Sequence, residues 1–388
     1  MTEDNGKLKI LVCLLYYLPH RTGMQLYIER IAEALVQRGH EVTVLAARHR
    51  PELPSEERIN GVRVVRLWAP PFPISRGMIM PRYPLAASRL IREHDVVSIH
   101  TPMLEAALLS LLAKIHGKPV IPTHHGDLIL PPGPFNRMVQ SGMFMQYQFM
   151  AKRAPHIVAY SEDYADNSYY LGPFREKVRV IYPPITMPQP NPERAAELRQ
   201  KWSHEGGPVI GYAGRFVQEK RPDLLIRSLD VINREYPNAR IVFAGEYDIP
   251  YEDTWERYQP VVEKYRDQLI FLGLSDDMQF MADFFAACDV LALTSDSECF
   301  ALVQVEAMLC GTPVVMTDTP GGRVPVQVTG MGELMKPGDS VDMGETILRV
   351  LENRDAYIRP RGEIEACFSF EETVDRYESL FREYAAHG

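Results

Sequence analysis

Two glutamates frame an almost wholly apolar stretch in the last third of the chain. Glu298 and Glu306 lie eight residues apart in SDSECFALVQVEAMLCGTPVV (295–315). A strand pattern precedes this stretch, and helix-forming residues run from near Phe300 to a stop at Gly311. The spacing predicts Glu298 in a loop and Glu306 inside the helix. Free backbone N–H groups at a helix start bind an anion, and a carboxylate on each side can accept hydrogen bonds from sugar hydroxyls.

A second motif supplies positive charge in the same half of the chain. GYAGRFVQEKRPDLL (211–225) follows a strand, turns at Gly214, and puts Arg215 and Lys220 just ahead of a helical pattern. Guanidinium and ammonium groups near a helix start can neutralise a diphosphate. The alternatives are a solvated loop of charges and, for the glutamates, one structural and one surface residue. The occurrence of both motifs in one half favours an anion site.

Alternating strand and helix patterns would position these groups. LKILVCLLYYLP (8–19) is a continuous apolar strand pattern, GMQLYIERIAEALVQRGH (23–40) has helical spacing, and EVTVLAA (41–47) is again a strand. Strand, helix and strand in that order imply a right-handed crossover in a parallel sheet. The alternation pauses at 182–194, where five prolines without periodicity predict an extended linker, and then restarts.

We therefore predict two Rossmann-like, doubly wound α/β domains with parallel sheets that face a cleft. The chain of 388 residues is long enough for two ordinary cores. Ligands of open parallel sheets bind beyond the carboxyl ends of the strands, and a domain boundary is a common binding site. The expected divisions are an N-terminal acceptor-side domain at 1–184, a linker at 185–194, a C-terminal donor-binding domain at 195–365 and a final helical segment at 366–388.

Composition narrows the class of protein. The net charge of −9 argues against a nucleic-acid binder, which needs a broad basic surface. Five scattered cysteines without a CxxC pair favour reduced thiols in the cytoplasm over a disulfide framework or a zinc site. The longest apolar run, Ile10–Leu18, is shorter than the roughly 20 residues of a membrane-spanning helix. Asp296 and Glu298 form a carboxylate pair without a third ligand, so no metal is expected.

The motifs GRFVQEK and ECFALVQVEAMLCGTPVV resemble those of the retaining glycosyltransferases of the GT-B fold, in the large family four (GT4). The resemblance implies that Arg215 and Lys220 hold the diphosphate of a nucleotide-sugar donor. It assigns the donor ribose to Glu306 and contact with the donor sugar to Glu298. It also implies that backbone amides grip the sugar and the phosphates at Phe300, Ala301, Leu302 and Val303. Ala301 stands where the family commonly has glycine.

The first half of the chain is similar to the same family. YYLPHRTGMQ resembles its first strand and glycine loop, with Gly23 approaching the donor phosphates and Thr22 in place of the usual preceding glycine. PTHHGD resembles its T-x-H-G segment, which implies that His125 lies near the reacting sugar. A lone histidine is more often structural, but here two adjacent histidines end a strand. In this fold the C-terminal helix crosses back onto the first domain.

The resemblance implies transfer of a hexose from a nucleotide-diphosphate sugar to a hydroxyl acceptor, with the anomeric configuration retained. UDP-hexose is the first expectation for the donor and GDP-mannose the second, with no further cofactor. The expected catalytic residues are His125, Arg215, Lys220 and Glu298. A related enzyme that epimerises or hydrolyses the nucleotide sugar, and a non-catalytic binding subunit, remain open. A nicotinamide dehydrogenase is strongly disfavoured because the first loop lacks G-x-G-x-x-G.

We expect the acceptor to be a hydroxyl group of a glycan, a lipid or a small molecule. Residues 70–84 and 127–154 are rich in Met, Phe, Ile and Pro, with interleaved basic residues Arg76, Arg82, Arg137, Lys152 and Arg153. Such a surface suits a lipid or an anionic membrane, so peripheral contact of a cytoplasmic enzyme with the inner face of the membrane remains open. An ordinary core helix beside a loop explains the same composition.

Overall fold

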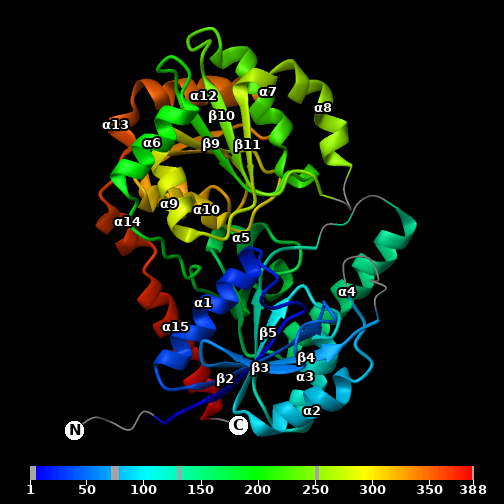
Figure 1. The fold of residues 1–388 in the computed structure, drawn as a ribbon. Helices are drawn as coiled ribbons and strands as arrows, with labels where there is room; N and C mark the ends of the chain where they lie inside the picture. Colours follow the sequence, from blue (N-terminus) through cyan, green and yellow to red (C-terminus); the bar gives the residue numbers. More distant parts are fainter. Residues whose placement is uncertain (1–5, 71–77, 129, 131–132, 250–252, 387–388) are drawn as a thin grey trace, which may run out of the picture. The chain divides into compact units, whose positions relative to one another are not determined.

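The chain folds into two compact units in a computed structural model that describes residues 6–70, 78–128, 130, 133–249 and 253–386 (Figure 1). The first unit comprises Met1–Pro184 and Phe370–Gly388, and the second comprises Ile185–Ser369. The first unit is therefore assembled from both ends of the chain, whereas the second is continuous. The change of unit falls at Pro184–Ile185 and again at Ser369–Phe370.

The first unit is built on an eight-stranded sheet in the order β3-β4-β2-β1-β5-β6-β7-β8. Its strands are β1 Lys9–Cys13, β2 Glu41–Arg48, β3 Glu56–Ile59, β4 Val62–Trp68, β5 Val96–Thr101, β6 Val120–His124, β7 Ile157–Ala159 and β8 Val178–Val180. Ile10 to Cys13 are all buried, as expected for strands of a parallel sheet covered on both faces. The order reverses between β1 and β5, so the loops after these strands flank a topological switch point.

One edge of this sheet departs from the expected parallel arrangement. Strand β3 pairs with β4 antiparallel, through a two-residue turn at Asn60 and Gly61. Both turn residues have positive φ, 48° and 87°, which matches the Asn-Gly hairpin preference. The prediction of a parallel-sheet α/β domain is confirmed, and strand β3 with its Asn-Gly turn is an antiparallel edge that hydrophobic periodicity did not reveal.

Helices cover the first sheet and include the end of the chain. They are α1 Gly23–Gln37, α2 Tyr83–Glu93, α3 Ala106–Ile115, α4 Pro134–Arg153, α5 Glu162–Asn167, the 3₁₀ helix η1 Gly172–Lys177 and α15 Phe370–Ala385. Helix α15, red in Figure 1, lies beside α1, blue. Arg38, just after α1, donates hydrogen bonds to carboxylates of α15: Glu371 at 2.8 Å, Asp375 at 2.6 Å and Glu378 at 2.9 Å.

The second unit has a six-stranded sheet in the order β11-β10-β9-β12-β13-β14. Its strands are β9 Val209–Ala213, β10 Arg240–Ala244, β11 Leu269–Gly273, β12 Val290–Leu293, β13 Val314–Thr317 and β14 Gly332–Met335. All these strands pair in parallel. Numbered within the unit, the order is 3-2-1-4-5-6, the doubly wound arrangement that binds ligands where the order reverses. That point lies between β9 and β12, and the prediction of a second doubly wound domain is confirmed.

The helices of the second unit connect these strands. They are α6 Pro192–Trp202, η2 Gln218–Lys220, α7 Pro222–Ile232, α8 Thr254–Lys264, η3 Arg266–Gln268, α9 Met278–Ala287, α10 Leu302–Leu309, α11 Val324–Thr329, α12 Ser340–Glu352, α13 Arg354–Tyr357 and α14 Arg361–Cys367. Helix α6 begins inside the segment expected to be linker, because the Asn191 side chain accepts hydrogen bonds from the N–H groups of Glu193 and Arg194. Within the described residues, no helix has the length and apolar character to cross a membrane.

Candidate functional site

The second unit carries a set of charged groups at its switch point. The loop after β9 and the loop after β12 leave neighbouring parallel strands at the same edge of the sheet. The N–H of Asp296 donates to the carbonyl of Glu219 at 2.8 Å, and the Thr294 hydroxyl donates to the carbonyl of Lys220 at 2.8 Å. The two motifs singled out from the sequence are therefore fastened to each other at the strand ends, where this fold places its ligands.

Lys220 and Glu298 form an ion pair across these two loops. The ammonium Nζ donates to Oε1 of Glu298, and Oγ of Ser295 donates to the same oxygen at 2.8 Å. Burial lowers the pKa of Lys220, but the charge of Glu298 and the hydrogen bond to it outweigh that effect and raise the pKa above its ordinary value. The raised pKa keeps the lysine charged. The Lys220 and Glu298 side chains are 23% and 12% exposed, so the ammonium can be reached from solvent.

A second cation stands at the turn itself. Arg215 follows Gly214 directly after β9 and is partly buried, and its carbonyl accepts a hydrogen bond from the Tyr212 hydroxyl at 3.3 Å. A Cβ on Gly245, after β10, would lie 2.1 Å from the Gly214 carbonyl oxygen, so the lack of a side chain at Gly245 lets these loops touch. Arg221 was not predicted as a site residue, and its guanidinium lies 3.5 Å from the carboxylate of Asp296. Three basic residues thus occur within seven positions of one turn.

Helix α10 starts from the same loop as Glu298. It begins at Leu302, two residues later than predicted, because Ala301 adopts a left-handed conformation with φ 56° and ψ 75°. Its Ala301 N-cap offers no side chain to its first backbone N–H groups. The helix ends at Leu309 and Gly311 has φ 83°, so the predicted stop is confirmed.

The remaining residues assigned to the donor lie on or beside this helix. Phe300 is fully buried, Val303 is partly exposed in the first turn, and Glu306 is nearly buried one turn further on. Glu298 stands in the loop and Glu306 in the helix body, as the spacing predicted. Their roles in binding the sugar and the ribose stay predictions.

A third loop, which follows β13, contacts the backbone of Glu298. Glu298 forms a single parallel β-bridge with Gly321, which follows β13. Gly321 has φ 77°, and a Cβ there would lie 2.5 Å from the carbonyl oxygen of Cys299. Gly321 and Ser295 were not among the site residues predicted from the sequence. The Gly-Gly dipeptide after a strand was the only signal for the first, and the i, i+3 spacing of Ser295 and Glu298 was the signal for the second.

The first unit brings histidine and tyrosine side chains together at the ends of three neighbouring strands. His125 follows β6, His100 lies in β5, and Tyr160 follows β7. Nε2 of His125 is 2.7 Å from Nδ1 of His100, and Nδ1 of His125 is hydrogen-bonded to the Tyr160 hydroxyl. The ring of Tyr27, from α1, stacks on Tyr160 at 5.1 Å and lies edge-on to His125 at 5.1 Å.

This cluster favours uncharged imidazoles. Burial lowers the pKa of His125 well below its ordinary value, and the neighbouring His100 and His124 lower it further. Burial alone lowers the pKa of His100 to about 3. Gly23 is the exposed first residue of α1, one turn before Tyr27. The sequence predicted His125 and Gly23 as site residues but missed His100 and Tyr160, although alternate residues Ser98 and His100 share one face of β5.

The segment considered for a lipid or membrane is partly described. Helix α4 buries Met143, Tyr147 and Met150, as a core helix does. It also exposes Phe135 and Met145, which are 55% and 68% accessible. Arg76 and the residues around it lie outside the described part of the chain. Contact with a membrane and the cellular compartment stay predictions.

Two family models match this chain and together cover most of it. "Glycosyl transferase 4-like domain" matches residues 22–184, and "Glycosyl transferases group 1" matches residues 194–363. One similar relative is a D-inositol 3-phosphate glycosyltransferase of Saccharomonospora viridis, 27% identical over 94% of this chain and 90% of that protein. Another is a GDP-mannose-dependent α-(1-6)-phosphatidylinositol monomannoside mannosyltransferase of Mycolicibacterium smegmatis, 26% identical over 84% of each.

Solved structures share the fold at lower identity. Anabaena HepE in complex with UDP and glucose has a TM-score of 0.77 at 21% identity, over 96% of this chain and 99% of that one. A sucrose-phosphate synthase of Thermosynechococcus elongatus has a TM-score of 0.77 at 20% identity, over 98% of this chain and 100% of that one. These likenesses identify the fold.

Proposed function

We propose that this chain, which belongs to the GT-B glycosyltransferases of family 4, moves a hexose from a nucleotide-diphosphate sugar to a hydroxyl acceptor. The configuration at the anomeric carbon is retained. The observation that carries this proposal is the Lys220–Glu298 pair at the switch point of the second unit. A charged ammonium, a neighbouring guanidinium and an uncapped helix start are the groups that bind a diphosphate.

Lys220 and Arg215 act on the leaving group. The bond between the anomeric carbon and the phosphate oxygen breaks, and negative charge builds on the nucleoside diphosphate. Cations fixed beforehand stabilise that charge more in the transition state than in the ground state. The acceptor oxygen forms the new bond to the anomeric carbon on the same face, and its proton passes to the departing phosphate oxygen. The configuration is retained because bond breaking and bond making share one face.

Glu298 has two tasks in this proposal. It holds the Lys220 ammonium at the strand ends, and its carboxylate accepts hydrogen bonds from the hydroxyls of the donor sugar. Ser295 and the bridge to Gly321 orient the carboxylate for both tasks. Glu306, one turn inside α10, binds the ribose. A sugar without the contacted hydroxyl should therefore lose rate as well as affinity.

We take UDP-hexose as the first donor to test and GDP-mannose as the second. HepE is described with UDP and glucose, and the mycobacterial relative is named for GDP-mannose, so neither base is favoured by both comparisons. Hydroxyl acceptors that contain inositol come first, because both named relatives carry inositol in their names.

The test begins with calorimetry of the full chain against UDP, GDP and ADP, followed by turnover with the matching sugar nucleotides. We expect one nucleotide to bind, and its sugar to appear on an inositol-type acceptor with no free sugar formed in excess. Consumption of donor without an acceptor would support the epimerase or hydrolase alternative. Tight binding of UDP or GDP without turnover on any acceptor would support the binding subunit.

A further inference from the structure

We propose that His100 and Tyr160 are positioning residues that hold the His125 ring by both of its nitrogens, so that His125 serves sugar transfer as an oriented, neutral imidazole and not as the base that removes a proton. This rests on the proposed function for the placement of His125 near the reacting sugar. The hydrogen bonds of the first unit carry the rest of the argument.

Four side chains form one line of hydrogen bonds across β5, β6 and β7. Oγ of Ser98 lies 3.1 Å from Nε2 of His100, Nδ1 of His100 lies 2.7 Å from Nε2 of His125, and Nδ1 of His125 meets the Tyr160 hydroxyl. Both nitrogens of His125 therefore face protein atoms. A base must present a nitrogen lone pair to the proton that it takes, and this ring has none directed at a substrate.

The line also fixes the protons when both rings are neutral. Its three links need three protons, the two imidazoles supply one N–H each, and the third comes from the hydroxyl of Ser98 or of Tyr160. Every proton must then point the same way along the line. His125 thus has a single tautomer in each of the two allowed arrangements, and its ring cannot flip without breaking a link.

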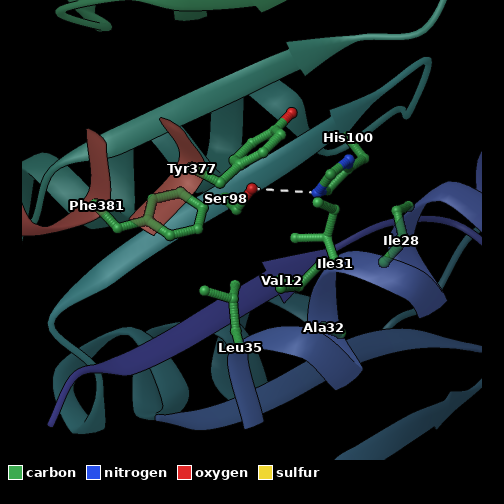
Figure 2. Close-up of a pocket in the computed structure, with 9 residues that line it drawn as sticks. All are labelled: Val12, Ile28, Ile31, Ala32, Leu35, Ser98, His100, Tyr377 and Phe381. Atoms are coloured by element: carbon green, nitrogen blue, oxygen red, sulfur yellow. Dashed lines mark hydrogen bonds between the residues drawn. The ribbon is translucent and has the colours of Figure 1, made fainter. Parts of the chain in front are cut away.

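The surroundings leave little water to replace a lost link. A cavity of about 10 Å³ lies beside His100, room for about one water molecule (Figure 2). Figure 2 places His100 and its link to Ser98 at the edge of this cavity, among apolar side chains such as Val12, Ile31 and Phe381. Removal of the His100 imidazole would leave Nε2 of His125 without its partner.

The titratable groups that face His125 come from each neighbouring element. They are His100 of β5, His124 of β6, Tyr160 after β7 and Tyr27 of α1. Asp127, the nearby carboxylate, is held by Nε2 of His124 at 3.0 Å. The lowered pKa of both His100 and His125 agrees with two neutral rings.

The test is a pH titration of ¹⁵N-histidine-labelled protein by NMR, in parallel with the pH profile of kcat. The His125 signals are assigned by their loss in His125→Ala. In the wild type we expect them to stay those of a neutral ring between pH 8 and 5, and kcat to show no acid limb from this residue. In His100→Phe we expect His125 to stay neutral, because burial still lowers its pKa, but its ¹⁵N signals to change as the fixed tautomer is lost, with a roughly tenfold lower kcat.

Two further variants separate positioning from general damage. His100→Gln can still hydrogen-bond the ring, so it should restore part of kcat. His94 is the matched control, a buried histidine of the same unit with both nitrogens bonded, to the Leu90 carbonyl at 2.6 Å and the Thr43 hydroxyl at 2.8 Å. It precedes β5, at the opposite end of the sheet from His125, so His94→Phe should leave the His125 signals and the pH profile unchanged.

The results decide the two proposals separately. A wild-type His125 that titrates between pH 5 and 8, or a His100→Phe protein with unaltered His125 signals and kcat, would overturn the role of His100. A neutral, non-titrating His125 in a chain that transfers no sugar would instead support the positioning of His125 by His100 and Tyr160 and overturn the proposed function.

Discussion

The two units place different chemistry at equivalent positions of similar sheets. In the second unit, loops after β9 and β12 are joined by a charged pair, Lys220 and Glu298, with partial exposure. In the first unit, the residues around His125 form a line of uncharged hydrogen bonds between neighbouring strands. The Lys220–Glu298 pair can exchange its ionic contact for one with a charged ligand, such as a leaving diphosphate. The neutral network has no unused hydrogen-bonding group, so its role is to fix the orientation of the His125 ring.

The largest expected effect is on the charged site. Lys220→Ala should lower kcat by about 10²–10³-fold, since loss of one preorganised group that stabilises developing charge costs this much. The fold should be unaffected, because the alanine still supplies the carbonyl that Thr294 binds. Steady-state kinetics with the donor identified by calorimetry measure the effect.

Lys264→Ala is the control for Lys220→Ala. Lys264 is also paired with a carboxylate, Asp230 at 2.8 Å, but on an exposed helix surface. Its removal should leave kcat unchanged. A near-normal rate for Lys220→Ala would remove the charged half of the comparison.

The support behind Glu298 can be broken without touching a charge. Gly321→Ala puts a Cβ 2.5 Å from the Cys299 carbonyl oxygen at a residue with φ 77°. We expect the free energy of unfolding to fall by about 2–3 kcal/mol and transfer activity to fall with it. Gly338→Ala has a similar φ of 74° and nothing within 4 Å of its Cβ, so it should cost only about 1 kcal/mol. Urea unfolding compares the two, and equal losses would mean that the loop contact is unimportant.

The neutral network should make the protein sensitive to acid. The pKa of His100 is lowered to about 3 in the folded chain, whereas in the unfolded chain it is about 6.5. The unfolded state therefore binds a proton that the folded state refuses, so this contribution to stability is full above about pH 6.5 and is lost as the pH falls toward 3. Each such group adds up to about 1.4 kcal/mol per pH unit to the slope.

Unfolding free energies at pH 7, 6 and 5 measure that slope. His100→Phe should unfold with a shallower loss of stability over this range than the wild type. Tyr83→Phe is the control, because burial raises the pKa of this α2 tyrosine above its ordinary value, so it is uncharged over this range and the variant should keep the wild-type slope. Equal slopes for the wild type and His100→Phe would show that His100 does not carry the acid sensitivity.

The smallest effect is expected at Ala301. Its left-handed φ of 56° is one that glycine adopts without strain. Ala301→Gly relieves this strain but adds freedom to the unfolded chain, so we expect a change within about 1 kcal/mol and retained activity. A large loss of activity with unchanged stability would reveal a direct role for the Ala301 methyl group.

Local patterns predicted the two sheets well because parallel strands buried on both faces read as unbroken apolar runs, as Ile10 to Cys13 do. The pairing of Lys220 with Glu298 could not be read in the same way. These residues are 78 positions apart and meet only because β9 and β12 are neighbours in the sheet. The link from His100 to His125 likewise depends on strand order, although the Ser98–His100 alternation was visible.

The start of α10 illustrates a different limit. Periodicity placed it near Phe300, but a left-handed residue at Ala301 delays it to Leu302. Backbone conformation at a single residue has no periodic signature, so only the resemblance, which has glycine at this position, hinted at it. Similarly, the proline-rich segment 182–194 shows no periodicity, so the sequence did not reveal that the Asn191 cap starts α6 there.

The return of α15 to the first unit bears on how the protein is made. Tyr377 of α15 shares hydrogen bonds with the Tyr27 hydroxyl at 2.6 Å and the Thr123 hydroxyl at 2.9 Å. During synthesis, residues 370–385 leave the ribosome only after all of 185–369. The second unit, being continuous, can complete its fold on the nascent chain, while the first must wait with an open α1 face. The earliest-made half of this enzyme is thus the last to mature.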